Sequence, residues 1–336
     1  FTTLFPTTRI AGVAFGVVVP AQVANGNLLA SSSARVTIGS LSVFASGGVA
    51  TFTNLVLTTA GSYTLTATST GLTSATSSSI TIVGGDASQL AFTVQPTSTT
   101  AGSALSPAPK VTVLDAYGNP VNSAAVITID PVSVAASNGV ATFSSLALTT
   151  AGTYTLTATS PGLASAVSNS FTISAATAYQ LGFSTEPPSS VTAGASFGAS
   201  VQVQDRYGNL VSSASKSITI GSTSMATVSG VATFTNLQLT TAGVYTLTAT
   251  ASAVISAVST PVTVTPALAA KLAFAVQPTS GTAGDALSPA PAVAIQDTYG
   301  NVVASTSGVT IGSTTVNAVA GVATFPNLVY TTAGTF

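Results

Sequence analysis

The sequence contains no cysteine, no histidine and no tryptophan, and only 4% of its 336 residues are charged. The absence of cysteine excludes a framework of disulfide bonds, so each folded domain must be held together by its apolar core alone. The absence of histidine leaves a serine nucleophile without the imidazole base that usually activates it. These absences argue against catalysis by this chain.

Charge is scarce in both signs. The net charge is −1, and the six basic residues stand singly at Arg9, Arg35, Lys110, Arg206, Lys216 and Lys271. Nucleic-acid binding needs basic residues gathered on one surface, so no nucleic-acid partner is predicted. The most apolar stretch, 13–24, is interrupted by Gly16, Pro20 and Gln22. Because a membrane-spanning helix needs about 18 or more apolar residues in a row, no span is predicted.

The sequence is instead dominated by an internal repeat. The segment Gly-Val-Ala-Thr-Phe occurs four times at intervals of 91 residues, ending at Phe52, Phe143, Phe234 and Phe325. A period of this length is too long for a solenoid and long enough for an independent small domain. We therefore predict four domains in tandem over 1–84, 85–175, 176–266 and 267–336. The first strand of the first domain is cut short, and the fourth domain lacks its last two strands.

Each repeat has the pattern of an all-β domain. In the second repeat, short runs of alternating apolar and polar residues are separated by turn signals, and no segment has helical periodicity. Strands are expected over 90–94, 111–115, 126–129, 140–148, 154–159 and 165–173. Asn138-Gly139 is typical of a tight hairpin turn. The pattern predicts an antiparallel β-sandwich of about seven strands.

The apolar residues that recur in every repeat are candidates for its core. Phe143 and Leu146 are three residues apart, so both face the core only if the strand bulges at 144–145. We expect Phe143, Leu146, Tyr154 and Leu156 to be buried, and likewise Phe234, Leu237, Tyr245 and Leu247. The structural residues that recur are Phe52, Phe143, Phe234 and Phe325, with Tyr63, Tyr154 and Tyr245.

Three motifs in a fixed order resemble bacterial immunoglobulin-like domains of the invasin/intimin type. They are Asp115-Ala-Tyr-Gly-Asn-Pro120, Asn138-Gly-Val-Ala-Thr-Phe143 and 149–158. The resemblance covers essentially the whole chain. It implies a tandem array of immunoglobulin-like (Ig-like) sandwiches in an extracellular or cell-surface protein. It also implies that the repeated tyrosines form the tyrosine corner of this fold. The first repeat departs from the motif, with Ala24-Asn-Gly-Asn27 at this turn.

Two motifs raise the question of a chemical site. Residues 194–198 match the G-x-S-x-G pattern of serine hydrolases, but no histidine is present to act as the base. Asp115, Asp205 and Asp297 are weak calcium candidates, because each turn offers one carboxylate and calcium needs six to eight oxygens. The alternative is an Asx-type turn, in which the carboxylate accepts backbone N–H groups. We predict no catalytic residue, no metal site and no cofactor, and therefore no enzyme.

Two functions remain. In the first, the chain is the structural body of an extracellular fibre or sheath, assembled from copies of itself. In the second, it is the stalk of an adhesin whose binding tip lies elsewhere. The low charge favours the first, because exposed sheet edges are usually protected by charged residues. The threonine rows 64–68 and 155–159 leave open a contact with glycan or a cell surface.

The end of the sequence adds one further expectation. The fourth repeat has no equivalent of residues 64–83, which would leave Phe325 and Leu328 in water. Either the polypeptide continues beyond Phe336, or a strand from another chain completes the domain by β-strand addition.

Overall fold

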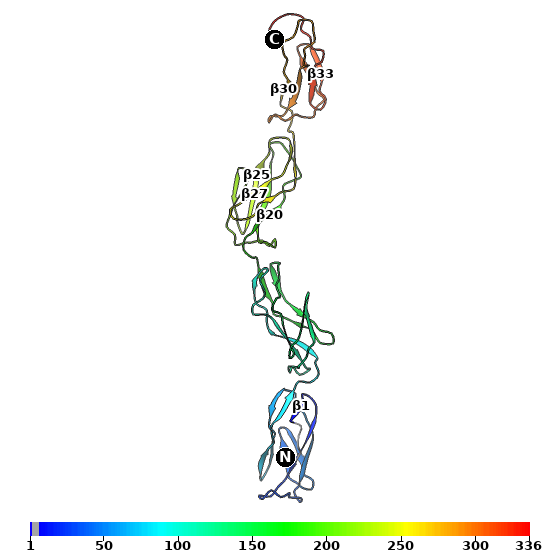
Figure 1. Cartoon of the computed structure of the whole chain (residues 1–336), viewed down its shortest axis with the longest axis vertical. Helices are drawn as coiled ribbons and strands as arrows, with labels where there is room; N and C mark the ends of the chain where they lie inside the picture. The colour runs from blue at the N-terminus through cyan, green and yellow to red at the C-terminus, as the bar shows by residue number, and fades with distance from the viewer. Residues whose placement is uncertain (2–6) are drawn as a thin grey trace. The chain divides into compact units, whose positions relative to one another are not determined.

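The computed structural model describes residues 1 and 7–336, and within this range the chain forms β-strands and no helix (Figure 1). The strands fall into four groups, over 8–83, 89–174, 180–265 and 271–324, and every sheet joins strands of one group only. We call these groups repeats 1 to 4. Two compact units contain them, Phe1–Ser174 and Ala175–Phe336. The predicted all-β fold is confirmed, while the domain limits at 84, 175 and 266 stay predictions.

Repeat 2 shows the complete arrangement of a repeat. Its strands are β10 (Gln89–Val94), β11 (Thr99–Thr100), β12 (Lys110–Leu114), β13 (Val126–Ile129), β14 (Val132–Ala135), β15 (Val140–Thr142), β16 (Gly152–Tyr154), β17 (Thr157–Ala158), β18 (Ala166–Val167) and β19 (Phe171–Ser174). One sheet has the order β10-β12-β15 and is antiparallel. The facing layer contains β11-β19-β16 together with the hairpins β13-β14 and β17-β18. This is the architecture of a two-layer sandwich.

Repeat 3 has the same arrangement with longer strands. Its strands are β20 (Gln180–Thr185), β21 (Ser190–Thr192), β22 (Ser196–Gln204), β23 (Ser217–Ile220), β24 (Thr223–Ala226), β25 (Val231–Gln238), β26 (Gly243–Tyr245), β27 (Thr248–Thr250), β28 (Ala257–Val258) and β29 (Val262–Thr265). The sheets are β20-β22-β25, β21-β29-β26 and β24-β23-β27-β28.

Repeat 1 follows the same order from its second strand onward. Its strands are β1 (Thr8–Ile10), β2 (Phe15–Pro20), β3 (Arg35–Ile38), β4 (Leu41–Phe44), β5 (Val49–Leu55), β6 (Gly61–Tyr63), β7 (Thr66–Ser69), β8 (Leu72–Thr76) and β9 (Ile80–Val83). The shortened first strand that the sequence predicts falls largely on residues 2–6, outside the described residues.

Repeat 4 has five strands. They are β30 (Lys271–Val276), β31 (Ala292–Gln296), β32 (Gly308–Ile311), β33 (Thr314–Asn317) and β34 (Val322–Thr324). They form the sheet β30-β31-β34 and the hairpin β32-β33. Residues 334–336, the counterparts of β16, form no strand, and the described residues of repeat 4 include no counterparts of β17–β19.

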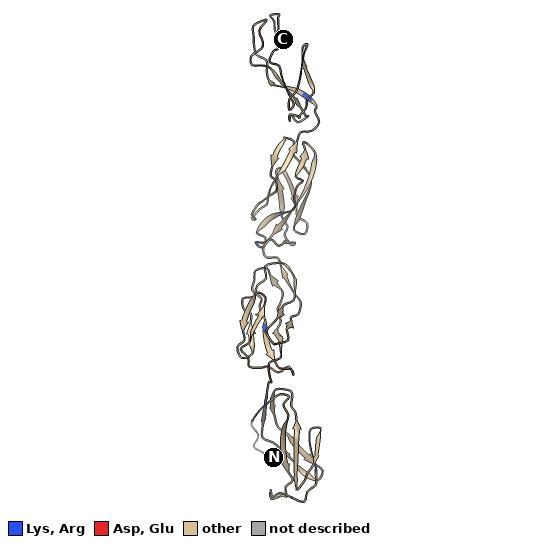
Figure 2. Cartoon of the chain, turned by 90° about the vertical axis from the view of Figure 1, so that its right-hand side faces the viewer, with Lys and Arg blue, Asp and Glu red and all other residues tan. Residues whose placement is uncertain are grey.

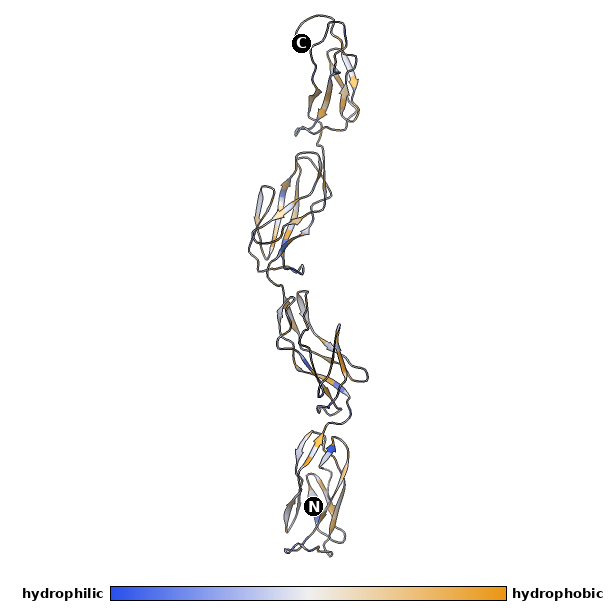
Figure 3. Cartoon of the chain, in the orientation of Figure 1, coloured by the Kyte–Doolittle hydropathy of each residue, from blue (hydrophilic) through white to orange (hydrophobic). Residues whose placement is uncertain are grey.

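The core of each repeat is centred on the recurring phenylalanine, and the apolar strand positions are visible along each sandwich in Figure 3. The exposed fractions of Phe52, Phe143, Phe234 and Phe325 are 2%, 1%, 2% and 1%. The predicted bulge is confirmed in repeats 1 and 3. In repeat 3, Phe197 pairs with Leu237 and Ala199 pairs with Phe234, so between these pairs two residues on β25 lie opposite one residue on β22. The extra residue lets both Phe234 and Leu237 face the core.

Two expectations about burial are wrong. Tyr154 and Tyr245 are only half-buried, because each ring lies beside the glycine two residues earlier at the edge of its sheet. Phe325 and Leu328 are 1% and 5% exposed although repeat 4 has five strands. Their neighbours in the core come from β31, β32 and the segment after β33, which are all present.

Three strands that the sequence predicts as continuous are interrupted, and the first of them, 140–148, ends as β15 at Thr142. The segments 154–159 and 165–173 each break into two strands, around Leu156 and Ser168. The Leu156 amide donates to the buried Ser168 Oγ at 2.9 Å, and Ser168 Oγ donates to the Asn169 carbonyl at 2.8 Å. Ser168 thus joins the break in one segment to the break in the other. Both segments continue from the sheet β11-β19-β16 into the hairpin β17-β18.

Candidate functional site: the junction between consecutive repeats

The buried carboxylates of the described residues all come from one type of turn. Asp115, Asp205 and Asp297 are 1%, 0% and 0% exposed, and each begins an Asp-x-Tyr-Gly-Asn segment. In repeat 2 the Asp115 amide donates to the Asn119 carbonyl at 2.9 Å, which closes the turn. Gly118 has a φ of 85°, a conformation that favours glycine.

Asp115 joins this turn to the linker before its repeat. Its Oδ1 accepts the amides of Tyr117 and Asn119, both at 2.8 Å. Its Oδ2 accepts the amide of the linker residue Gly85 at 2.9 Å and Asn119 Nδ2 at 2.8 Å. Burial raises the pKa of Asp115, but these hydrogen bonds outweigh it and lower the pKa to about 2. The carboxylate therefore stays ionised in the fold over the ordinary pH range.

The other two aspartates have the same contacts. Asp205 Oδ2 accepts the Ala176 amide and Asp297 Oδ2 accepts the Ala267 amide, both at 2.9 Å. Burial raises the pKa of each, and the asparagine side chain and backbone amides lower it further than burial raises it, to about 2 for Asp297. The linker is thus fastened to the following repeat in each case.

Asn119 connects the turn to the preceding repeat within the first unit. Its Nδ2 donates to the Thr58 carbonyl at 2.7 Å, and its Oδ1 accepts the Ala60 amide, also at 2.7 Å. Thr58 and Ala60 belong to the Thr-Thr-Ala-Gly turn of repeat 1. Both ends of one amide side chain are therefore used to hold the two repeats together.

Tyr117 completes this junction. Its ring lies so close to Gly12 of repeat 1 that a Cβ on Gly12 would overlap it, and Gly12 has a φ of 77°. The turn that Asn119 contacts is itself fixed, because the Tyr63 hydroxyl donates to the Thr59 carbonyl at 3.0 Å. Tyr154 bonds Thr150 in the same way at 2.9 Å. These bonds are those of a tyrosine corner, and here the corner shapes the surface that the next repeat contacts.

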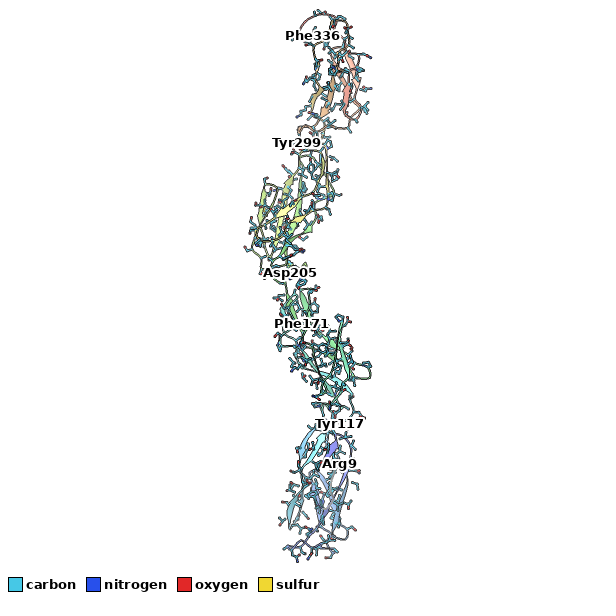
Figure 4. All side chains as sticks on the ribbon, viewed as in Figure 1. Arg9, Tyr117, Phe171, Asp205, Tyr299 and Phe336 are labelled. Carbon is cyan, nitrogen blue, oxygen red and sulfur yellow. The ribbon has the colours of Figure 1, made fainter. Side chains whose placement is uncertain are left out.

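The second unit repeats the arrangement with different residues. Asn301 Nδ2 donates to the Thr240 carbonyl at 2.8 Å, and Asn301 Oδ1 accepts the Ala242 amide at 2.7 Å. The ring of Tyr299 lies against Gly194 as that of Tyr117 lies against Gly12. Figure 4 labels Tyr117 and Tyr299 at these two junctions. Because both units have the same contacts, we take the junction to be a recurring structural feature of the repeat.

These contacts bear on the candidate chemical motifs. Gly194, the first residue of the G-x-S-x-G match, is a contact of Tyr299, and Ser196 Oγ accepts Gln238 Nε2 at 3.0 Å. No group of three acidic residues suited to a metal ion occurs in the described part of the chain. The calcium candidate Asp115 binds four protein donors, as the Asx-type interpretation expects.

Repeat 1 keeps the turn and lacks the carboxylate. Val23 occupies the place of Asp115, since its amide donates to the Asn27 carbonyl at 2.9 Å. Gly26 again has a positive φ, of 87°. The backbone geometry therefore does not depend on the aspartate, whose particular contribution is the bond to the linker.

No protein-family model matches the sequence, and no curated protein is significantly similar to it. Among solved structures, InvD of Yersinia pseudotuberculosis has 15% identity over 76% of this chain and 94% of that chain, with a TM-score of 0.34. FdeC, an Escherichia coli adhesin, has 15% identity over 76% and 88%, with a TM-score of 0.29. A β-glycosidase from Bacteroides vulgatus has 13% identity over 53% of this chain and a TM-score of 0.26. The chain spans only 25% of that enzyme.

Sequence reasoning missed the residues that join one repeat to the next. The Asx-type turn predicted at Asp115 assigns Asn119 no partner in another repeat, and none of the recurring motifs includes Gly12. A signal was present, because each Tyr-Gly-Asn turn after the first repeat follows a Thr-Thr-Ala-Gly turn in the repeat before it. The buried serines 77, 168 and 259 were also missed, although they recur at the same interval of 91 residues.

Proposed function

We propose that the chain is a non-enzymatic structural segment of an extracellular, cell-surface protein, in which consecutive repeats are fixed to one another as a spacer. The observation that carries this proposal is the junction. Domains joined by a linker move relative to one another by default, unless an interface holds them. Here a buried carboxylate holds the linker, an amide side chain bonds the preceding repeat, and a tyrosine ring lies against a glycine of that repeat.

The absence of cysteine makes the proposal testable by distance measurement. Ser74 in repeat 1 and Ser165 in repeat 2 are exposed, and replacing both with cysteine gives the full chain two labelling sites only. Single-molecule energy transfer should give one narrow distance distribution. Removing the junction with Tyr117→Ala and Asn119→Ala should broaden it, because the two hydrogen bonds and the ring contact are lost.

The matched control is Asn169→Ala, at an exposed asparagine of repeat 2 outside the junction. It should leave the distribution narrow. A distribution that is equally broad before and after removal of the junction contradicts the spacer role.

Self-assembly into a fibre is a second candidate, and the scarcity of charge supports it. Figure 2 marks only a few charged residues on the ribbon. The strands β4, β14, β24 and β33 lie at sheet edges and contain no charged residue, and Phe44 on β4 is 69% exposed. Uncharged edges lack the usual protection against pairing with another chain.

Sedimentation at increasing protein concentration tests this second candidate. Assembly should bury more than about 1,000 Å² per chain. It should also change little when salt is raised, since few charges are present to be screened. A chain that stays monomeric at high concentration contradicts assembly, and so does an assembly that dissolves in salt.

A further inference from the structure

Repeat 3 differs from the other repeats around one turn, which covers residues 252–255 between β27 and β28. Ala253 in this turn has a φ of 58°. Gly71 and Gly162 stand at the corresponding positions of repeats 1 and 2, with φ of 79° and 77°. Alanine at positive φ is strained, and strained backbone is concentrated at binding and switch regions. The backbone of this turn therefore sets repeat 3 apart.

Two cations that are ten residues apart in the sequence lie beside this turn. Lys216 Nζ donates to the carbonyl of Ser252, the first residue of the turn, at 2.9 Å. The amide of Ile255, the last residue of the turn, donates to the Tyr179 carbonyl at 2.9 Å. The guanidinium of Arg206 lies over the Tyr179 ring, with Cζ at 5.6 Å from the ring centroid. We call the side chains of Tyr179, Arg206, Lys216 and Ile255 the repeat 3 patch.

All four residues of the repeat 3 patch differ from their counterparts in the other repeats. The counterparts are Ser88 and Ala270 for Tyr179, Ala24, Ala116 and Thr298 for Arg206, Ala34, Ala125 and Ser307 for Lys216, and Thr73 and Ala164 for Ile255. Repeat 3 thus has large or charged side chains at four positions where the other repeats have small uncharged ones. Because a spacer needs the same contacts in every repeat, the patch indicates a role that repeat 3 has alone.

The positive charge of the patch is not neutralised by neighbouring acids. Neither Arg206 nor Lys216 forms an ion pair with a residue in the described part of the chain. Asp205, which precedes Arg206 and is labelled in Figure 4, is buried, and its carboxylate accepts four hydrogen bonds from Ala176, Tyr207 and Asn209. The charge of Asp205 is therefore held inside its own turn, whereas Arg206 is exposed. Such a positive surface attracts anions.

The other groups of the patch suit a sugar that carries a carboxylate. Tyr179 and Ile255 are 44% and 53% exposed, so the apolar C–H face of a sugar ring can pack against them. Beside Tyr179, Gln180 Nε2 donates to Gln204 Oε1 at 3.3 Å, and the two amides have further donors and acceptors for sugar hydroxyls. A guanidinium that rests on an aromatic ring is held in place to bind a carboxylate through two parallel hydrogen bonds.

We propose that the repeat 3 patch binds an acidic polysaccharide, whose carboxylates pair with the two cations and whose sugar rings pack on Tyr179 and Ile255. The surface is open, which suits a chain-like ligand that lies across it. Single-stranded nucleic acid fits less well, because Arg206 already covers one face of the only aromatic ring in the patch and two cations are few for a phosphate backbone. The proposal goes beyond the spacer role and does not depend on it.

Titration calorimetry of the full chain with matched oligosaccharides tests the proposal. The acidic probes are short oligomers of galacturonic acid and of mannuronic acid, and the neutral controls are the oligomers of galactose and mannose, which lack the carboxylates. At least one acidic oligomer should bind at one site per chain, and added salt should weaken its binding because charges take part. The proposal is overturned if neither acidic oligomer binds or if the neutral oligomers bind equally well. Equal or tighter binding of single-stranded DNA at the same salt concentration overturns it as well.

Two variants and one control locate the site. Arg206→Ala should weaken binding of the acidic oligomer by about tenfold or more, because charge-assisted hydrogen bonds to the carboxylate are lost. Tyr179→Ser, which introduces the residue of repeat 2, should weaken it by about threefold or more. The matched control Arg35→Ala removes the same charge at an exposed arginine of repeat 1 and should leave binding unchanged. Equal effects of Arg206→Ala and Arg35→Ala overturn the proposal, because net charge alone would then attract the oligomer.

Discussion

Repeat 4 has counterparts of β10 and of β12–β15 of repeat 2, with a similar sequence, but the exposure of corresponding residues differs between the two repeats. Phe143 and Phe325 are both 1% exposed, and Leu146 and Leu328 are 3% and 5% exposed. Leu90 and Leu272 are 5% and 58% exposed. The same residue at the same position in a repeat is thus buried in one case and exposed in the other.

The difference separates two parts of the sandwich core. One part surrounds the recurring phenylalanine and is closed by strands that both repeats possess. The other part lies under the first strand and is closed only by the segment 152–174, which contains β16–β19 and accepts the Leu90 amide at the Ala164 carbonyl. Burial of the second part is therefore a property of the complete domain, and no local pattern of β30 reveals whether its leucine is covered.

The largest effect is expected for the phenylalanine. Phe143→Ala and Phe325→Ala should each destabilise their own repeat by about 3–5 kcal/mol, because both leave a cavity at a fully buried site. Hydrogen exchange of strand amides in repeats 2 and 4 measures each effect separately. A loss below about 1 kcal/mol in repeat 4 means that Phe325 is not buried there as Phe143 is in repeat 2.

The sharpest contrast is expected for the leucine of the first strand. Leu90→Ala should cost repeat 2 about 2–5 kcal/mol, as for other buried leucines. Leu272→Ala should change repeat 4 by less than about 0.5 kcal/mol, since its side chain is already largely in water. Denaturant dependence of hydrogen exchange in β12 and β31 checks both. Similar losses of stability in the two repeats would show that the Leu272 side chain is covered as that of Leu90 is.

A fall in pH should destabilise repeats 2 and 4 alike. The pKa of Asp115 and of Asp297 is about 2 in the fold against an ordinary value of 3.8. A carboxyl group whose pKa is lower in the folded state stabilises the fold above its unfolded pKa, and this contribution is lost as pH falls from about 4 toward 2. Thermal unfolding midpoints of repeats 2 and 4 should therefore fall together in this window.

Repeat 1 supplies the internal control for this acid effect, because Val23 replaces the aspartate and residues 1–83 contain no acidic residue. Hydrogen exchange in the centre of repeat 1 should depend less on pH between 4 and 2, after correction for the intrinsic rate. Asp115→Asn should flatten the pH dependence of repeat 2 and leave that of repeat 4. If the stability of repeat 2 still depends on pH after this substitution, a group other than Asp115 causes that dependence.

The sequence was sufficient for the features that arise within one repeat. The two-residue period identifies the strands, and the three-residue step from Phe143 to Leu146 predicts a bulge, because only an extra residue lets both side chains face the core. The Asx-type turn follows from the chemistry of Asp, Gly and Asn. These features are local, so neighbouring residues determine them.

Features that depend on distant residues could not be predicted in this way. The strand break at Ser168 arises because its hydroxyl replaces a backbone partner of Leu156, twelve residues away. The role of Asn119 depends on Thr58, 61 residues earlier in another repeat. The burial of Phe325 without strands like β16–β19 depends on how its neighbours close around it. A periodic pattern predicts to which face of a sheet a side chain points. It does not predict whether another segment of the chain covers that side chain.

The smallest effect concerns the tight turn before the recurring phenylalanine. Asn138 in repeat 2 and Ala320 in repeat 4 occupy the same turn position, with φ of 50° and 48°. The glycines that follow them also have positive φ, as a type I′ turn requires. Asparagine tolerates this conformation, whereas alanine pays roughly 1–2 kcal/mol for it. Ala320→Gly should therefore stabilise repeat 4 by about 0.5–1 kcal/mol, after the entropy that glycine loses on folding is subtracted.

The matched substitution Asn138→Gly should change repeat 2 by less than about 0.5 kcal/mol, because asparagine carries little strain at this position. Hydrogen exchange at the paired strands beside each turn measures both values. Ala320→Asn should stabilise repeat 4 as well, which separates relief of strain from the flexibility that glycine introduces. If Ala320→Gly instead destabilises repeat 4, the turn there does not hold its alanine at positive φ, and the two repeats differ in this turn as well as in the cover of their first strand.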